Sequence, residues 1–314
     1  MNCYVRVMMA HCTSFVCMAA LLCWITAVSL AQEIHNAEED AIKASRADPV
    51  LVGAGDIASC DDLAGAEATA KLIDKIPGTV MAVGDLAYPD GSEEQFANCY
   101  GPTWGRFRQR TRPAAGNHEY HKGTPSAYNH YFGSAAGDPA KAYYSYDLGT
   151  WHIVVLNSEC AEVGGCAATS PQGLWLKQDL AQHPSTCTLA YFHQPLFSSG
   201  GKHGNNLEMK PFWDLLYEAA AELVINGHDH NYERFAPQDP EGHLREGRGI
   251  REFVVGTGGK NSHRRMGVVQ PNSEVRNDDT FGVLKLTLHA TGYDWEFVPE
   301  NGKTFSDKGS GVCH

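Results

Sequence analysis

The chain has 314 residues, of which 43% are hydrophobic and 20% are charged, and these proportions exclude an intrinsically disordered protein. The length suits one large domain or two small ones and is sufficient to bury a sizeable core. The formal net charge of −12 argues against nucleic acid and anionic membranes as partners, so an anionic substrate would need a strong local positive centre such as bound metal ions.

The N-terminal residues 1–31 have the composition of a secretory signal peptide. Arg6 is the only charged residue among them, and a long apolar stretch ends at Leu30. Small residues at Ser29 and Ala31 occupy the two positions that a signal peptidase reads, which predicts cleavage after Ala31. We therefore expect a secreted or periplasmic protein that leaves the membrane after cleavage and carries a net charge of −13.

The alternative is an uncleaved membrane anchor, which is disfavoured because His11, Thr13 and Ser14 shorten the apolar run. After the cleavage site, the polar and alanine-rich residues 32–48 are expected to form a loose leader or a short helix. Residues 49–314 then form the predicted catalytic domain.

The first part of this domain has the pattern of a βαβ unit. Apolar runs at Val50–Ala54 and Thr79–Val83 predict two buried strands, and each is followed by Gly-Asp. The residues between them, 62–76, have helical spacing of apolar side chains and stop before Pro77-Gly78.

The alternation of strands and helices continues along the chain. Further buried strands are predicted at Trp151–Leu156, Thr188–Phe192 and Leu223–Ile225, with helices near 171–183 and 208–220. After Arg251 three segments read as antiparallel strands that close the sheet: 252–259, 282–288 and 293–298. We expect one α/β domain with mixed sheets and outer helices, and in such folds ligands bind beyond the carboxyl ends of the strands.

The cysteines outside the signal peptide are even in number, which in an exported protein indicates disulfide bonds. They are Cys60, Cys99, Cys160, Cys166, Cys187 and Cys313. Six cysteines allow about 15 pairings, which remain open. Cys160 with Cys166 is the most local pair, and Cys60 and Cys99 each follow a motif loop and are candidate neighbours. A CxxC pattern is absent, which disfavours a thiolate zinc site.

Five short motifs occur in order along the chain. They are GDIA (55–58), GDLAY (84–88), GNHE (116–119), FHQP (192–195) and GHDH (227–230). Each motif alone is weak evidence, because Gly-Asp after a strand is usually turn chemistry and a single histidine on a strand is usually a core residue. The inference of a functional site rests on the occurrence of all five motifs in one chain.

The spacing of the first three motifs matches the length of βαβ units. Asp56 and Asp85 are 29 residues apart, and Asn117 comes 32 residues later. We therefore expect all the motifs at the same edge of the sheet, where two carboxylates, one amide, three imidazoles and a phenol converge. Metal ions would offset the cost of gathering these polar groups. Oxygen and imidazole ligands suit iron, zinc or manganese rather than calcium, and the lack of cysteine ligands argues against a structural zinc site.

This ordered set of motifs resembles the calcineurin-like metallophosphoesterases over about residues 50–235. Tyr88 makes it similar to the purple acid phosphatase group, in which the second motif reads GDxxY. The resemblance implies a four-layer α/β/β/α sandwich with two mixed β-sheets and a metal site at the carboxyl ends of the strands.

The resemblance also implies two metal ions. The first, Fe(III), would be held by Asp56, Asp85, Tyr88 and His230. The second, Zn, Fe(II) or Mn, would be held by Asp85, Asn117, His193 and His228. Asp85 would join the two ions, which lie about 3.5–4 Å apart in such centres.

The implied activity is hydrolysis of phosphate monoesters on small phosphorylated substrates. A metal-bound water that becomes hydroxide near neutral pH would attack phosphorus in line, and both cations would neutralise the phosphoryl oxygens. His118 would face the leaving group. Its alternative role is to orient a neighbouring metal ligand. His203 would contact phosphate or lie on a solvated loop, and Lys202 stands where the family often has a second histidine. Glu119 and Asp229 are expected to be structural.

Two departures from the family pattern are visible. Ala58 replaces a common glycine in the first motif and restricts the backbone angles that are open to that loop. Only about 18 residues separate the predicted cleavage site from the first core strand, which leaves no room for the extra N-terminal β-sandwich of the larger plant-type enzymes.

Three other functions stay open. A phosphodiesterase acting on a cyclic nucleotide or a glycerophosphodiester would use the same centre, although Tyr88 favours monoesters because many diesterases of the superfamily lack it. A secreted binding protein without activity would be expected to have lost a ligand, and all seven are present. Redox chemistry at iron is a conceivable side activity. The sequence leaves the oligomeric state open.

Overall fold

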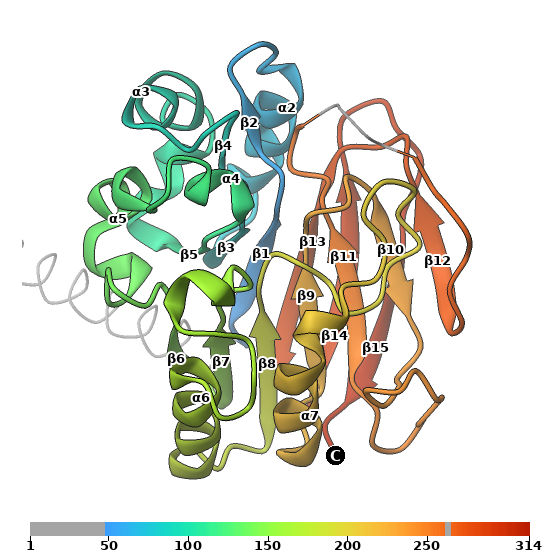
Figure 1. Cartoon of the computed structure of the whole chain (residues 1–314). Helices are drawn as coiled ribbons and strands as arrows, with labels where there is room; N and C mark the ends of the chain where they lie inside the picture. The colour runs from blue at the N-terminus through green and yellow to red at the C-terminus, as the bar shows by residue number, and fades with distance from the viewer. Residues whose placement is uncertain (1–47, 261–264) are drawn as a thin grey trace, which may run out of the picture. The chain divides into compact units, whose positions relative to one another are not determined.

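The computed structural model describes residues 48–260 and 265–314, and Asp48–His314 forms one compact unit (Figure 1). The predicted signal peptide and leader lie outside the described residues. Within the described ranges, no helix has the length and apolar composition needed to cross a bilayer.

The first large sheet of the described residues combines a parallel half with an antiparallel half. Its strands, in spatial order, are β15 (Lys308–Val312), β14 (Gly292–Pro299), β13 (Gly282–His289), β1 (Val50–Ala54), β3 (Thr79–Val83) and β5 (Thr111–Ala114). β1, β3 and β5 are parallel, whereas β13 pairs antiparallel with both β1 and β14. The carboxyl ends of the three parallel strands therefore meet at one edge.

The second large sheet has parallel strands at its centre. Its order within the described residues is β12 (Ser273–Asn277), β10 (Tyr232–Phe235), β11 (Arg251–Val255), β9 (Leu223–Asn226), β8 (Cys187–Tyr191), β7 (Trp151–Val155) and β6 (Tyr144–Leu148). β11, β9, β8 and β7 are parallel, and β12, β10 and β6 complete the sheet through antiparallel pairs.

One strand prediction is correct only in part. The segment 252–259 was expected to be antiparallel and to close the sheet; β11 is antiparallel to β10, but it is parallel to β9 and lies inside the second sheet. Its last four residues are buried, as a strand covered on both faces requires, and this apolar pattern says nothing about strand direction. The other two segments, which become β13 and β14, are antiparallel as predicted.

The longer helices form where the sequence predicts them, and shorter ones lie in the loops. The helices are α2 (Ala64–Ile73), α3 (Glu93–Gln95), α4 (Asn117–Tyr120), α5 (Ser126–Phe132), α6 (Pro171–Gln182) and α7 (Lys210–Glu218). Short 3₁₀ or π helices span Phe96–Tyr100, Trp104–Arg110, Gly133–Ala136, Cys160–Val163 and Leu207–Met209.

The alternation of side chains along the second sheet places its core residues on two faces. Ile153 and Leu189 belong to the core cluster that also contains Leu51 of the first sheet, whereas Val154 packs in a separate cluster with Trp213 of α7. Successive residues of a strand point to opposite faces, so one face of this sheet packs toward the first sheet and the other packs under α6 and α7. This arrangement confirms the prediction of two mixed sheets with helices outside.

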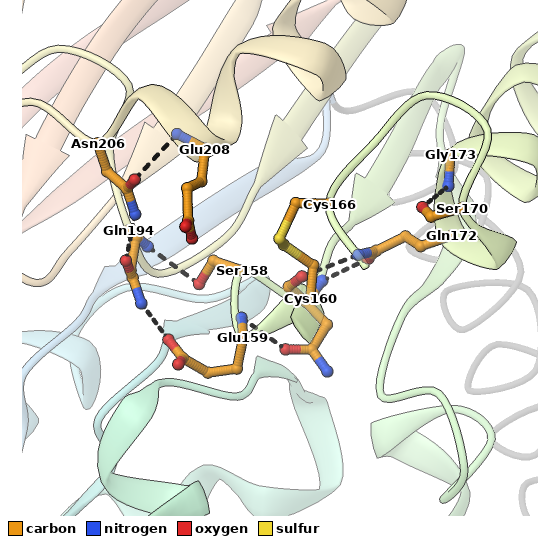
Figure 2. The surroundings of a disulfide bond; sticks show 11 residues. Ser158, Glu159, Cys160, Cys166, Ser170, Gln172, Gly173, Gln194, Asn206 and Glu208 are labelled. Carbon is orange, nitrogen blue, oxygen red and sulfur yellow. Dashed lines mark hydrogen bonds between the residues drawn. A yellow bond between two sulfur atoms is a disulfide. The ribbon is translucent and has the colours of Figure 1, made fainter. Parts of the chain in front are cut away.

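The described residues contain three disulfide bonds, which connect all six cysteines. Cys160 pairs with Cys166, as the local spacing suggested (Figure 2). Cys60 pairs with Cys99, which confirms that these two are neighbours. The third bond, Cys187–Cys313, joins the start of β8 to the residue after β15 and so links the two sheets covalently.

Candidate metal centre

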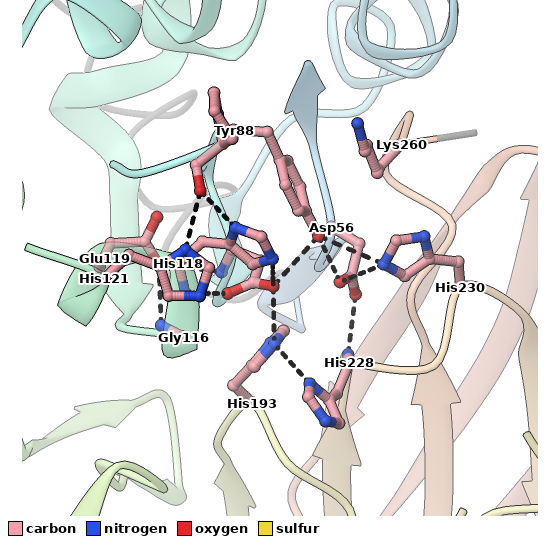
Figure 3. Close-up of polar contacts among 12 residues, drawn as sticks. Asp56, Tyr88, Gly116, His118, Glu119, His121, His193, His228, His230 and Lys260 are labelled. Atoms are coloured by element: carbon pink, nitrogen blue, oxygen red, sulfur yellow. Dashed lines mark hydrogen bonds and ion pairs between the residues drawn. The ribbon is translucent and has the colours of Figure 1, made fainter. Parts of the chain in front are cut away.

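The predicted metal ligands come together where the carboxyl ends of parallel strands from both sheets meet (Figure 3). Asp56 follows β1, Asp85 and Tyr88 follow β3, Asn117 follows β5, His193 follows β8, and His228 and His230 follow β9. The expectation that all motifs share the edge of one sheet is therefore wrong. The oxygen donors come from the first sheet and the imidazoles from the second, because each sheet has its own set of parallel strands.

The backbone at three of these residues has an unusual conformation. Asp56, Asp85 and His228 have positive φ angles of 59°, 53° and 71°. Residues other than glycine rarely adopt such angles, and they persist only when the surrounding structure enforces them. This turn directs each side chain inward immediately after its strand ends.

The two Gly-Asp loops of the first sheet are joined by backbone pairing. β2 (Ala58–Ser59) runs parallel to β4 (Ala87–Tyr88), and the Ile57 N–H donates to the Asp85 carbonyl at 2.9 Å. Ala58 is buried in this pairing and lacks a positive φ, so the glycine common in the family is not required here.

The motif glycines allow close approach between loops. A Cβ atom added at Gly116 would lie 2.2 Å from Asp85 Oδ1. At Gly84, where φ is +77°, it would lie 2.5 Å from His193 Nδ1. Both distances are far below van der Waals contact, so only glycine fits at these positions.

One group of donor atoms converges on the Tyr88 hydroxyl. This oxygen lies 2.8 Å from Asp56 Oδ1, 3.1 Å from Asp85 Oδ2 and 3.3 Å from His230 Nε2. Burial and the two nearby carboxylates raise the pKa of Tyr88 well above its usual value, so without a cation the phenol keeps its proton. The phenol has one proton and cannot donate a hydrogen bond to all these acceptor atoms at once, whereas a metal cation can be bound by several of them.

A second group surrounds His193 Nε2. His193 Nδ1 lies 2.9 Å from the Val83 carbonyl, which only accepts, so Nδ1 carries a proton. Nε2 then lies 3.2 Å from both Asp85 Oδ2 and His228 Nδ1. Burial lowers the pKa of His193, but Asp85 and Asp56 raise it to about 10, so in this state a second ring proton stands where a cation would bind.

Asp85 belongs to both groups. Its Oδ2 atom faces Tyr88 on one side and His193 on the other. Burial raises the pKa of Asp85. The charge and hydrogen bonds of His193, and then those of His118, lower this pKa by more than burial raises it, so the carboxyl is ionised. Burial, and then the positive charge of His193, lower the pKa of His228 to about 3.

The donor set fits metal ions. The ligand atoms of Asp85, His193 and His228 all lie within 4.8 Å of one another, which suits a shared cation. Asn117 Oδ1 is buried and accepts no hydrogen bond from the described residues, which is costly for an amide oxygen unless a cation meets it.

Two buried carboxylates support the loops from outside the donor set. Glu119 accepts N–H bonds from Asp85 at 3.0 Å and from Gly116 at 2.8 Å. Burial and the Asp85 charge raise the pKa of Glu119 to about 8 against the pull of these N–H groups. Asp229 accepts from the Ser198 hydroxyl at 2.6 Å and from the Gly204 N–H at 3.1 Å. Through these contacts both side chains hold loops in place, as expected for structural residues.

A cavity of about 370 Å³ opens over the donor groups. His118 and His203 both line it, together with Lys202. The His118 Nδ1 atom lies 2.5 Å from the Pro89 carbonyl, and its Nε2 atom lies 3.6 Å from Asp85 Oδ2. The His203 ring packs on His228 with centroids 4.0 Å apart. The loop carrying His203 is therefore folded over the site.

Lys260 and His121 also line the cavity and were not predicted from the sequence. Lys260 lies in the run GTGGK, just after the carboxyl end of β11. Because β11 is parallel to β9, its carboxyl end lies at the same edge as the ligand loops, and a correct prediction of this direction would have placed Lys260 near the site. His121 comes two residues after Glu119, and its ring packs on His118 with centroids 4.2 Å apart. In the sequence, the signal for His121 is its position two residues after the third motif, GNHE.

The motifs and the fold match known proteins. A family model described as calcineurin-like phosphoesterase matches residues 40–232. The chain is 32% identical to probable purple acid phosphatase 20 of Arabidopsis thaliana over 178 residues, which cover 49% of this chain and 39% of that protein.

Solved structures show the same fold. The purple acid phosphatase PPD1 from yellow lupin (Lupinus luteus) seeds aligns with a TM-score of 0.62 and 19% identity, covering 84% of this chain and 54% of that one. GAP50, the anchor in the inner membrane complex of Plasmodium, aligns with a TM-score of 0.64 and 16% identity, covering 84% and 89%. At these identities the likeness concerns the fold alone.

The match to the plant relatives is partial. The aligned region spans 37% to 43% of the length of three Arabidopsis purple acid phosphatases.

Proposed function

Because the chain belongs to the calcineurin-like phosphoesterase family, we propose that it hydrolyses phosphate monoesters at a centre of two metal ions. The observation that carries the proposal is the position of Asp85 Oδ2 between two groups of donor atoms. It lies 3.1 Å from the Tyr88 oxygen and 3.2 Å from His193 Nε2. One carboxylate placed in this way could provide a ligand to each of two cations.

The two groups of donor atoms define the two proposed sites. Asp56, Asp85, Tyr88 and His230 would hold the first ion, and Asp85, Asn117, His193 and His228 the second. A phenolate is a hard anionic donor, so the first site suits Fe(III), and the mixed donors of the second suit Zn, Fe(II) or Mn. When bound, the two ions supply an acidified water as nucleophile and positive charge for the phosphoryl oxygens.

The chain's own residues position the ester in this proposal. Hydrolysis breaks the bond between phosphorus and the ester oxygen, and water supplies the oxygen of the released phosphate and the proton of the released alcohol. His118 is held by Pro89 through Nδ1, which leaves Nε2 directed at the site to exchange a proton with the leaving oxygen. His203 is placed beside His228 to donate a hydrogen bond to phosphate.

The proposed location is outside the cytoplasm. Three disulfide bonds within the described residues support export, since such bonds persist in oxidising compartments. The signal-like composition of residues 1–31 supports the same location.

Metal analysis combined with a visible spectrum tests the first site. The purified protein is expected to hold two metal ions and to show a broad tyrosinate-to-iron band that is lost in Tyr88→Phe. A colourless protein that holds two zinc or manganese ions would contradict Fe(III) at the first site while leaving the centre itself in place.

Hydrolysis assays test the activity. p-Nitrophenyl phosphate is expected to be a better substrate than bis(p-nitrophenyl) phosphate, and Asp85→Asn is expected to abolish turnover because both ions lose a ligand. A preference for the bis ester would favour the phosphodiesterase alternative. A metal-loaded protein inert on all phosphate esters would contradict the enzyme assignment.

A further inference from the structure

The wall of the cavity carries an excess of positive charge outside the proposed metal ligands. The residues that complete the lining are Pro89, His118, His121, Lys202, His203 and Lys260. Among the described lining residues the only carboxylate is that of Asp85, a proposed ligand. Lys202 and Lys260 are the cations among these residues, and in a chain with 37 acidic and 25 basic residues two lysines at one cavity indicate an anionic occupant.

Lys260 is held beside the first proposed metal site. Its backbone N–H donates to the Asp56 carbonyl at 2.8 Å, and its ammonium group donates to the Ser59 hydroxyl at 2.9 Å. The ammonium lies 4.9 Å from the centroid of the Tyr88 ring (Figure 3). It forms no ion pair with a carboxylate of the described residues, so a half-buried cation faces the cavity without a counterion.

Lys202 lies on the loop that follows strand β8 of the second sheet. Asp229 anchors this loop through the N–H of Gly204 and the hydroxyl of Ser198, and the Gly201 N–H donates to the Arg265 carbonyl at 2.7 Å. Lys202 is exposed, and it also lacks a carboxylate partner among the residues that the structure describes. Its backbone is thus fixed at the cavity while its ammonium group stays free to bind.

These two lysines exceed what a single phosphate group requires. Two bound cations already neutralise the phosphate that is hydrolysed, and further unpaired ammonium groups beside them would be repelled. A second anionic group in the substrate removes this repulsion and forms charge-assisted hydrogen bonds with the ammonium groups. The cavity volume of about 370 Å³ restricts that substrate to a small molecule.

We propose that Lys202 and Lys260 form a subsite for a second phosphate group, so that the preferred substrates are small molecules with two phosphates. This proposal rests on the proposed phosphatase function. The two phosphates can belong to a phosphoanhydride or to a bisphosphate on a carbon skeleton. With an anhydride, water adds to one phosphorus, the bridging oxygen leaves with the other phosphate, and two phosphate products share the two protons of water.

Substrate-dependent kinetics test the subsite. kcat/KM is measured for phenyl phosphate, pyrophosphate and fructose 1,6-bisphosphate in the wild type, Lys202→Met and Lys260→Met. Each substitution is expected to lower kcat/KM for the two-phosphate substrates about tenfold more than for phenyl phosphate, mainly through KM, since each removes a charge-assisted hydrogen bond. Comparing pyrophosphate with the bisphosphate shows which of the two sources the subsite accepts.

Two controls separate charge from folding. Lys260→Arg keeps the positive charge and is expected to restore most of the preference for two phosphates. Lys122→Met removes a lysine that pairs with Asp90 at 3.4 Å outside the cavity, and it is expected to change kcat/KM little for any substrate. Added salt is expected to raise KM more for pyrophosphate than for phenyl phosphate in the wild type.

The outcomes distinguish this proposal from the proposed function. An equal loss on all three substrates would assign the lysines to the transferred phosphate and overturn the subsite, and unchanged kinetics in both variants would overturn it as well. A metal-loaded wild type without activity on any ester would contradict the phosphatase function instead. In that case calorimetric binding of pyrophosphate decides the subsite, with weaker binding in Lys260→Met than in Lys122→Met as the supporting result.

Discussion

Glu119 connects two ligand loops through a single buried side chain. Oε2 accepts the N–H groups of Asp85 and Gly116, and Oε1 accepts that of Leu86 at 2.9 Å and that of Ala87 at 3.4 Å. All four partners are donors and none can accept a carboxyl proton, so these contacts favour the ionised form of Glu119 although burial and the Asp85 charge raise its pKa to about 8. The positions of Asp85 and Asn117 at the metal centre therefore depend on a residue that is not itself a proposed ligand.

Replacing Glu119 is expected to weaken both the fold and metal binding. Glu119→Gln places an amide NH₂ against backbone N–H donors and is expected to cost about 1–3 kcal/mol in unfolding free energy. Glu119→Ala leaves all four N–H groups without this acceptor and is expected to cost more. Urea denaturation and bound-metal content measure both effects, with exposed Glu94→Gln as the control. A Glu119→Gln protein with wild-type stability and metal content would contradict this role.

At the level of single residues, the sequence located the side chains that converge at the candidate site because each lies in a short motif, and four of the five motifs contain glycine. The glycines matter physically, since a side chain at Gly116 or Gly84 would collide with a neighbouring loop. Lys260 was missed because its place at the cavity depends on the position of β11 in the second sheet. Roles that follow from local chemistry were predictable, and those that follow from the packing of distant strands were not.

Among the secondary-structure elements, the strands that were not predicted are β2, β4, β5, β6, β10, β12 and β15. Two of these, β5 and β15, contain residues that are poor strand formers. β5 contains Pro113, which is tolerated because β5 is the last strand of its sheet and the missing N–H breaks no ladder. β15 contains Gly309 and Gly311, where a Cβ would lie 2.4 Å from the rings of Trp295 and Tyr293. Aromatic side chains of β14 thus cover these glycines and supply the packing that they lack. Such compensation depends on tertiary contacts and leaves no signal in local sequence.

The edge of the second sheet is attached to α6 by a buried histidine. His152 of β7 faces Asp147 of β6 at 3.0 Å through Nδ1 and Asp179 of α6 at 2.8 Å through Nε2. Burial lowers the pKa of His152, but hydrogen bonds to Asp179 and Asp147 raise it above the usual value. The charged ring is therefore the form that the folded protein favours.

The stability provided by His152 is expected to depend on pH. Because its pKa is raised on folding, its contribution is fully present below about pH 6.5 and is lost as the pH rises through the folded-state pKa. Urea denaturation at pH 5.5 and pH 9 is expected to show a larger loss for His152→Gln at the lower pH. Exposed His130→Gln is the matched control and is expected to show little loss at either pH. A loss that is equal at both pH values would contradict a charged His152.

At the scale of the whole molecule, the two sheets meet at the proposed metal centre and are also linked by Cys187–Cys313. The disulfide joins the start of β8 to the residue after β15, whereas the proposed ligands follow the carboxyl ends of the parallel strands. Asp85 from the first sheet and His193 from the second would share a cation. Metal ions would then act as a connection between the sheets in addition to their proposed catalytic role.

Removal of the metal ions is therefore expected to destabilise the folded chain. Metal at 100 times its dissociation constant adds about 2.7 kcal/mol of stability, so chelation is expected to lower Tm by roughly 5–10 °C for a domain of this size. Re-addition of metal should restore Tm, and both effects should be lost in Asp85→Asn. Asp214→Asn, which alters a carboxylate paired with Lys210 at 2.7 Å, should respond to chelation like the wild type. A Tm unaffected by chelation, in protein shown to have lost its metal, would mean that the packed core and the disulfide hold the sheets together without the ions.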